Sequence, residues 1–286
     1  MADSGDNLWR IGAPPFLGAQ PLVRGLEAHP QVRLTRAVPS RLAELLEGDE
    51  LDAALLPAID YFRLTVEAQE RPRHPGAPGL AIVPGIAVAS RGPVGSVRLF
   101  CRADWPLIRH VALDPGSGTS NCLVRLILKE VYHVSPHYRW PQPDAGAIDR
   151  ESHAHLLIGD RGLAHETRDY YRVLDLGGAW QRYARKPFVY AVWAARQTQG
   201  LVQLAELLTE AQERGLAARD EIARTCAAGA GVSPERAREH LFENIHYGLG
   251  PEELVGLQTF YRWAAKEELA TQNVPIRLIV KPAAKS

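Results

Sequence analysis

The stretch "VALDPGSGTSNCLVRLILKE", residues 111–130, joins a short apolar run to a long helical pattern through a loop of small residues. Its first three residues predict a strand, and the apolar spacing over 119–131 predicts a helix. The two glycines of "PGSG" let the backbone turn tightly, and Thr119 or Ser120 is a favoured N-terminal cap. In α/β sheets, ligands bind beyond the C-terminal ends of strands and against helix N-termini, and this loop has that position.

Short apolar runs alternate with amphipathic stretches along most of the chain, which is typical of βαβ units. Strands are expected at 8–13, 32–38, 51–57, 80–90, 95–102, 111–113, 138–140, 156–158, 171–176 and 187–195. Helices are expected at 19–29, 119–131, 201–214, 217–228 and 251–269, and at 40–46 after a cap at Ser40. Two strand-like segments, near 90–99 and 187–195, would link two βα halves. The pattern therefore predicts an α/β protein of two lobes, with the second lobe inserted into the first.

The lobes can be assigned to residue ranges. Residues 1–95 and 192–286 are expected to form the first lobe, whose C-terminal part is helical. Residues 96–191 are expected to form the inserted second lobe. The ligand cleft is expected between the two lobes.

Composition favours a small-molecule ligand. Lys plus Arg and Asp plus Glu both number 33, so no overall charge would draw the chain to nucleic acid or to an anionic membrane. The sequence has no apolar run of about 18 residues, so no membrane span is expected. Three cysteines without a CxxC pair argue against a disulfide scaffold and a structural zinc site. With acidic residues where a secretory signal needs basic ones, the chain is expected to be cytoplasmic.

The loop before the predicted helix has the chemistry of an anion site. A helix N-terminus offers unpaired N–H donors and a partial positive charge, to which Ser117, Thr119 and Ser120 can add hydroxyls. A phosphate-binding Walker loop needs a lysine before the Ser/Thr, and this loop has none. A carboxylate is therefore the expected ligand. The alternative that Gly118, Thr119 and Ser120 only cap the helix stays open.

Other polar residues have weaker signals. Asp160 follows a predicted strand and either caps the next turn or faces the cleft. Ser90, at the end of a strand, either donates into the cleft or is an ordinary turn serine. His153 and His155 lack a third ligand, so no metal site is expected. The chain has no GxSxG motif, which removes support for acyl transfer.

Five blocks, in order and spacing, resemble the chorismate dehydratase family of the futalosine route to menaquinone. These blocks are "GIAVASRGPVGSVRLFCR", "ALDPGSGTSNCLVRLIL", "LLIGDRGL", "DLGGAWQRYARKPFVYAVWAAR" and "ENIHYGLGPEELVGLQTFY". The resemblance extends from about residue 11 to residue 261. It implies a fold like the type II periplasmic binding proteins. It also implies a cytoplasmic lyase that removes water from chorismate, giving 3-[(1-carboxyvinyl)oxy]benzoate without a metal or organic cofactor.

The loop and the strand ends, together with the resemblance for Gly18, predict where the substrate binds. The expected substrate-binding residues are Gly18, Ser90, Ser117, Gly118, Thr119, Ser120 and Asp160. No side chain in the blocks is an obvious general base, so one hypothesis is that the enolpyruvyl carboxylate of the substrate takes the proton, held by the loop at 117–120. The family usually has Asn where this chain has Gly18, in "PFLGAQPL". Either a backbone group, Gln20 or a water replaces that side chain, or the chain has another substrate or no activity.

Two other functions remain open at this point. The first is a binding protein of the same fold that holds a small carboxylate without chemistry. The second is the sister enzyme of the pathway, which makes a dihydroxy-naphthoate. The apolar residues Leu254, Leu257, Phe260 and Tyr261 either pack on the first lobe or form a homodimer face.

Overall fold

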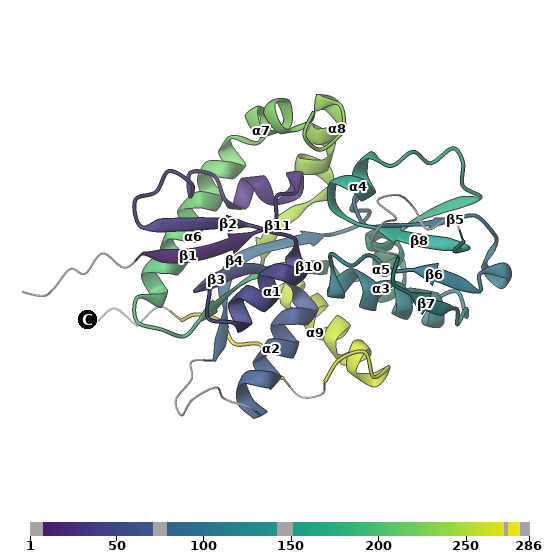
Figure 1. Cartoon of the computed structure of the whole chain (residues 1–286), viewed down its shortest axis with the longest axis horizontal. Coiled ribbons are helices and arrows are strands. Elements are labelled where there is room, and N and C mark those ends of the chain that lie inside the picture. Colours follow the sequence, from purple (N-terminus) through teal and green to yellow (C-terminus); the bar gives the residue numbers. More distant parts are fainter. Residues whose placement is uncertain (1–7, 71–78, 142–150, 272–273, 281–286) are drawn as a thin grey trace, which may run out of the picture.

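The computed structural model describes residues 8–70, 79–141, 151–271 and 274–280. These residues form two lobes that lie beside each other (Figure 1). Each lobe is a sheet flanked by helices. The first sheet has the order β11 (His246–Leu249), β4 (Leu80–Ser90), β10 (Phe188–Arg196), β3 (Ala53–Pro57), β1 (Trp9–Ala13) and β2 (Val32–Arg36). The second sheet has the order β7 (His137–Arg139), β6 (His110–Ala112), β8 (Ala154–Leu157), β5 (Arg98–Cys101) and β9 (Arg172–Asp175).

The chain leaves the first sheet after β4 and returns to it at β10. The five strands between them form the second sheet, so the second lobe is inserted into the first, as the sequence predicts. The two crossing segments are antiparallel neighbours, with Phe188 paired to Ser90 and Ala194 to Ile82. The residue limits of the lobes, 1–95, 96–191 and 192–286, stay a prediction.

Both sheets mix parallel and antiparallel pairs. In the first sheet β1 is parallel to β2 and β3, whereas β10 and β11 run antiparallel to their neighbours. In the second sheet β6 is parallel to β7 and β8, and β5 is antiparallel to β8 and β9. Four strands that have parallel neighbours are β1, β3, β6 and β8. Each of these strands ends beside a helix or loop that can face the junction of the lobes.

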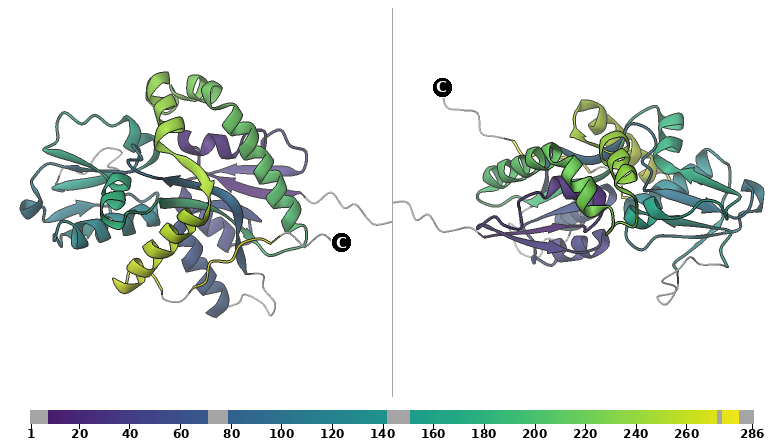
Figure 2. Two further views of the ribbon diagram at one scale, coloured as in Figure 1. Left: turned by 180° about the vertical axis from the view of Figure 1, so that it is seen from behind. Right: turned by 90° about the horizontal axis from the view of Figure 1, so that it is seen from above.

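Helices cover both faces of the first sheet (Figure 2). One apolar cluster contains buried residues of α1 (Pro39–Glu47), α2 (Ala58–Glu70) and α9 (Pro251–Lys266), together with the core of the second lobe. The other contains residues of the short 3-10 helix η1 (Leu17–Leu22), α6 (Leu201–Ala217), α7 (Arg219–Cys226) and α8 (Pro234–Glu239). In the second lobe the helices are η2 (Trp105–Leu107), α3 (Gly118–Glu130), α4 (Gly159–Ala164) and α5 (Leu176–Ala184).

Several predicted elements differ from the structure. The helix predicted at 19–29 is only the 3-10 helix η1 followed by turns, because Pro21 lacks a backbone N–H and Gly25 has a φ of 83°. Helix α1 begins at Pro39 after Val38, so the prediction that Ser40 caps it is wrong. The helix expected from 119 begins at Gly118.

The C-terminal apolar residues pack inside the first lobe. Leu257, Phe260 and Tyr261 are buried, and the Tyr261 ring stacks on Phe62 with 3.7 Å between ring centroids. The packing interpretation is therefore confirmed for these residues, and a homodimer stays a prediction. Among the described residues, no helix combines the length and apolar character that crossing a membrane requires.

Helix α6 supports η1, which carries Gly18, through a very close contact. A β-carbon on Gly215 would lie 1.8 Å from the carbonyl oxygen of Pro21. We expect Gly215→Ala to lower the free energy of unfolding by about 1–3 kcal/mol, although alanine is the better helix former. Urea denaturation of Gly215→Ala and of Gly229→Ala measures this. At Gly229 the nearest atom, the carbonyl oxygen of Cys226, would be 3.5 Å away, so that control should stay near wild type. Equal stability of the two variants would contradict the packing described.

Candidate functional site

A buried carboxylate organises the loop between β6 and α3. Asp114 is 1% exposed and accepts hydrogen bonds from the backbone N–H of Gly116 at 2.8 Å and of Ile158 at 3.1 Å. Arg161 donates to the same carboxylate at 2.7 Å. The side chain of Asn121 bonds both the N–H and the carbonyl of Asp114, at 3.0 and 2.6 Å. The loop, the start of α3 and the start of α4 are thereby held together.

Helix α3 is capped by Ser117, and not by Thr119 or Ser120 as predicted. The Ser117 backbone is extended, with φ −149° and ψ 110°, and its Oγ accepts from the N–H of Ser120 at 3.3 Å. The Ser117 hydroxyl also donates to the Ser120 hydroxyl at 3.2 Å. Ser117 is favoured because a cap must accept from an N–H three residues ahead while its own backbone stays extended.

Only part of this loop faces the junction of the lobes. Ser117 and Ser120 line a cavity there. Thr119 is completely buried, and its Oγ1 accepts from the N–H of Ile59 at the start of α2, at 3.0 Å. Gly118 lies against Ile59 and Asp60 on the other side of α3. Gly118 and Thr119 therefore connect the lobes and do not line the cavity.

The cavity has walls from both lobes. Its polar lining residues are Ser96, Ser117, Ser120, Asp160, Tyr190 and His240. Among the described residues that line it, none is Lys or Arg. Its free volume is about 90 Å³, below the roughly 300–1,000 Å³ of typical ligand sites. The lobes are therefore closed on each other in this conformation.

Asp160 joins the second lobe to the first. Its Oδ1 accepts from the N–H of Leu17 in η1 at 2.9 Å. The N-cap of α4 is Ile158, so the interpretation of Asp160 as a helix cap is wrong, and its carboxylate lines the cavity instead. Burial raises the pKa of Asp160, and the Leu17 N–H opposes this by stabilising the charged form.

Ser90 contributes indirectly. It is 2% exposed, and its hydroxyl lies 3.1 Å from the hydroxyl of Tyr190. Tyr190 lines the cavity, whereas Ser90 lies behind it. Burial raises the pKa of Tyr190 far above its ordinary value, so the phenol is neutral. The two residues belong to the two crossing strands β4 and β10.

Gly18 and His240 form the wall opposite the loop. Gly18 lines the cavity from η1, and its carbonyl accepts from the hydroxyl of Tyr247 at 3.0 Å. A β-carbon on Gly18 would lie 2.6 Å from Cδ1 of Ile245 and 3.4 Å from Nε2 of His240. The imidazole of His240 therefore stands next to the space that a side chain at residue 18 would take.

Sequence reasoning missed His240. Its side chain is 2% exposed and lies at the start of a π-helical turn, His240–Asn244, a rare element that often occurs at functional sites. Burial, followed by the charge of Arg236, lowers the pKa of His240 to about 4, so the imidazole is neutral at pH 7. No spacing or motif indicates His240, because the π-helical turn places it.

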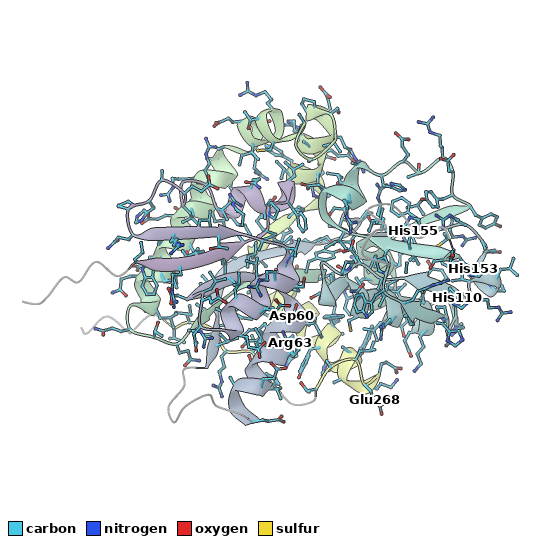
Figure 3. The ribbon with its side chains drawn as sticks, in the orientation of Figure 1. Asp60, Arg63, His110, His153, His155 and Glu268 are labelled. Carbon is cyan, nitrogen blue, oxygen red and sulfur yellow. The ribbon has the colours of Figure 1, made fainter. Side chains whose placement is uncertain are left out.

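The two histidines considered for metal binding lie in the second lobe, in and just before β8 (Figure 3), and do not line the cavity. His155 is buried, and its Nε2 lies 3.1 Å from the Tyr170 hydroxyl. The His153 ring stacks on His110 with 5.7 Å between centroids. Within the part of the chain that the structure describes, no three His, Cys, Asp or Glu residues are placed to hold a metal ion.

Three comparisons place the chain among known proteins. The chorismate dehydratase of Thermus thermophilus is 31% identical over 267 residues, which cover 87% of this chain and 93% of the relative. A structural-genomics protein of Archaeoglobus fulgidus superposes with a TM-score of 0.70 at 16% identity, covering 91% of this chain and 98% of that one. The alkanesulfonate-binding protein of Xanthomonas axonopodis superposes with a TM-score of 0.63 at 15% identity, covering 92% and 94%.

These similarities confirm two predictions. The solved structures show the periplasmic-binding-protein-like fold of two lobes. The curated relative confirms the resemblance found in the sequence blocks. A family model described as menaquinone biosynthesis matches residues 9–266. Because that match spans most of the chain, the protein belongs to the menaquinone biosynthesis family.

Proposed function

We propose that this chain is a chorismate dehydratase and converts chorismate into 3-[(1-carboxyvinyl)oxy]benzoate by loss of water, as a hydro-lyase. The observation that carries the proposal is the cavity between the lobes, with the hydroxyls of Ser117 and Ser120 at the N-terminus of α3. The curated chorismate dehydratase, which is similar over 87% of the chain, supports it. The three unpaired cysteines support a reducing, cytoplasmic location.

The lining of the cavity suits an anionic substrate of this kind. Hydroxyls and helix N–H groups can bind a carboxylate without a Lys or Arg beside it. The apolar lining, which includes Phe16, Val88 and Ile245, suits a six-membered ring. Because the present cavity is small, we infer that the lobes separate to admit chorismate and close around it.

The reaction needs one proton removed and one hydroxyl released. The proton leaves the ring carbon that bears the ether oxygen, the hydroxyl leaves the neighbouring carbon, and an aromatic ring results. We propose that the enolpyruvyl carboxylate of the substrate takes the proton, oriented by Ser117 and Ser120. The carboxyl group so formed carries the proton that the departing hydroxyl needs to leave as water. The protein then supplies orientation and hydrogen bonds, which can give large rate enhancements.

His240 is our candidate for the group that holds the departing hydroxyl. The resemblance of the sequence blocks implies an Asn where this chain has Gly18, and Nε2 of His240 lies beside that position. A neutral imidazole can donate a hydrogen bond through Nε2. An asparagine at residue 18 would require the Ile245 side chain to shift, since its Cδ1 would be 2.6 Å from the β-carbon.

Two other functions have less support. The alkanesulfonate-binding protein shares the fold at 15% identity, so that likeness supports the fold and no particular activity. The sister enzyme that makes a dihydroxy-naphthoate has no specific observation in its favour.

The assay of the proposal is direct. Purified protein and chorismate, mixed in metal-free buffer, should yield the aromatic enolpyruvyl product, detected by chromatography with mass detection. Ser120→Ala should lower kcat/KM by about tenfold, because one hydrogen bond to a charged group is lost. Ser40→Ala, in α1 and outside the cavity lining, should match wild type. Binding of chorismate without turnover would instead favour a receptor.

The role of His240 predicts a split between kinetic constants. His240→Ala should lower kcat by about a hundredfold with KM little changed, as expected when a hydrogen-bond donor to the transition state is lost. His240→Gln keeps a donor and should recover part of the rate. His137→Ala, on the exposed edge strand β7, is the matched control. If the alanine and glutamine variants lose activity only as much as they lose folded protein, His240 has a structural role alone.

The lowered pKa of His240 also predicts how stability depends on pH. Unfolded His240 binds a proton below about pH 6.5, whereas folded His240 does so only near pH 4. The free energy of unfolding should therefore fall as the pH drops from about 6.5 to about 4, by up to about 3 kcal/mol. Denaturation of wild type and His240→Gln across this range measures it. The two curves should diverge as the pH falls, and parallel curves would contradict the assignment.

A further inference from the structure

A second hollow lies between the lobes on the other side of α3. It has a volume of about 600 Å³, within the range of ligand sites. Its walls come from α2 and residues 265–271 of the first lobe and from α3 and Trp140 of the second lobe. We call this hollow the α2–α3 groove.

Helix α3 lies between the groove and the cavity. Ser117 and Ser120 face the cavity, whereas Gly118, Asn121 and Arg125 face the groove. Residues three, four and seven apart share one face of a helix. The first two turns of α3 therefore present one face to the cavity and another face to the groove. The Thr119 hydroxyl, bonded to the N–H of Ile59, ties α3 to α2 at the same place.

Within the part of the chain that the structure describes, Arg125 is the one cation of the groove without a paired carboxylate. Arg125 has no hydrogen bond or ion pair to any residue that the structure describes, and its Nε is buried without a partner. Its guanidinium carbon lies 4.7 Å from the centre of the Tyr138 ring. An arginine placed like this is poised to take a carboxylate, which would satisfy its donors.

The other charges of the groove are accounted for. Arg63 is paired with Asp60 at 3.5 Å, with Glu67 at 3.0 Å and with Glu47 at 3.7 Å. Glu268 is exposed to water, and Figure 3 shows it away from Asp60 and Arg63, near the end of α9. Glu268 thus adds a negative charge that water screens, and Arg125 is the groove cation that attracts an anion.

An aromatic surface lies next to Arg125. Trp140 directly follows β7 and is 61% exposed, which is high for so large an apolar side chain. Trp140 is two residues after Tyr138, so in an extended chain both rings lie on one face. The groove thus offers a cation and a free indole face side by side.

We propose that the α2–α3 groove is a second ligand site, which takes a small aromatic carboxylate with its carboxylate on Arg125 and its ring on Trp140. Because both lobes form the groove, an occupied groove favours the closed arrangement of the lobes. A ligand there acts on the cavity through α3. This site is separate from the proposed dehydratase site and does not depend on that activity.

The test uses benzoate as the probe and Trp140 as the reporter. Protein is labelled with 5-fluorotryptophan, and the Trp140 fluorine signal is assigned by its loss in Trp140→Phe. Benzoate should shift the Trp140 signal in a saturable way. Benzoate in the cavity between the lobes can also move this signal through α3, and Arg125→Gln distinguishes the two sites because Arg125 lines the groove and not the cavity. The readout is a binding signal and is independent of catalysis. Cyclohexanecarboxylate should shift it less, because it lacks the aromatic ring.

Arg125→Gln should weaken the binding measured at Trp140 about tenfold or more, since a hydrogen bond to a charged group is lost. Arg33→Gln, which removes an exposed arginine from β2 outside the groove, should bind benzoate as wild type does. The remaining tryptophan signals show that each variant is folded. The proposal would be overturned if the Trp140 signal did not move at benzoate concentrations of roughly tens of mM. It would also be overturned if Arg125→Gln and wild type bound benzoate equally.

Discussion

The buried carboxylate of Asp114 is the interaction on which the rest of the site depends. A carboxylate removed from water is costly unless donors surround it, and Asp114 has two backbone N–H groups and Arg161. These donors belong to the loop after β6 and to the start of α4, so one charge fixes both. Ser117 follows Asp114 by three residues, and Asp160 follows Ile158 by two. The positions of the two polar walls of the second lobe are thus set by a residue that does not line the cavity.

The site combines closed lobes with polar groups that are neutral apart from Asp160. The imidazole of His240 and the phenol of Tyr190 are both neutral, because burial disfavours their charged forms. The Ser120 hydroxyl, which accepts from the Ser117 hydroxyl, still has its own proton to donate to an anion, and the carboxylate of Asp160 is held by the N–H of Leu17. Such a site can bind and orient a reactive carboxylate without neutralising it by a salt bridge, which would reduce its basicity. This is the property that a substrate acting as its own base requires.

The sequence predicted the two-lobed α/β fold and much of one wall. Alternating strand and helix periods located most strands, and the small residues of 115–120 located the start of α3. The sequence prediction failed at residues whose local sequence carries no structural signal or a misleading one. In the sequence, Asp114 has the pattern of an ordinary turn residue. The position of His240 depends on a π-helical turn. Asp160 contacts Leu17, which is 143 positions away in the chain. Ser117 rather than Thr119 is the cap, since backbone geometry and not residue type decides between neighbouring hydroxyls.

The most direct test of the proposed site is a crystal structure of the chain with 3-[(1-carboxyvinyl)oxy]benzoate bound. The product should lie between the lobes, with its enolpyruvyl carboxylate on the hydroxyls of Ser117 and Ser120 and its ring edge near Nε2 of His240. A structure in which the product occupies another surface, or lies between the lobes with both carboxylates away from α3, would contradict the proposed site.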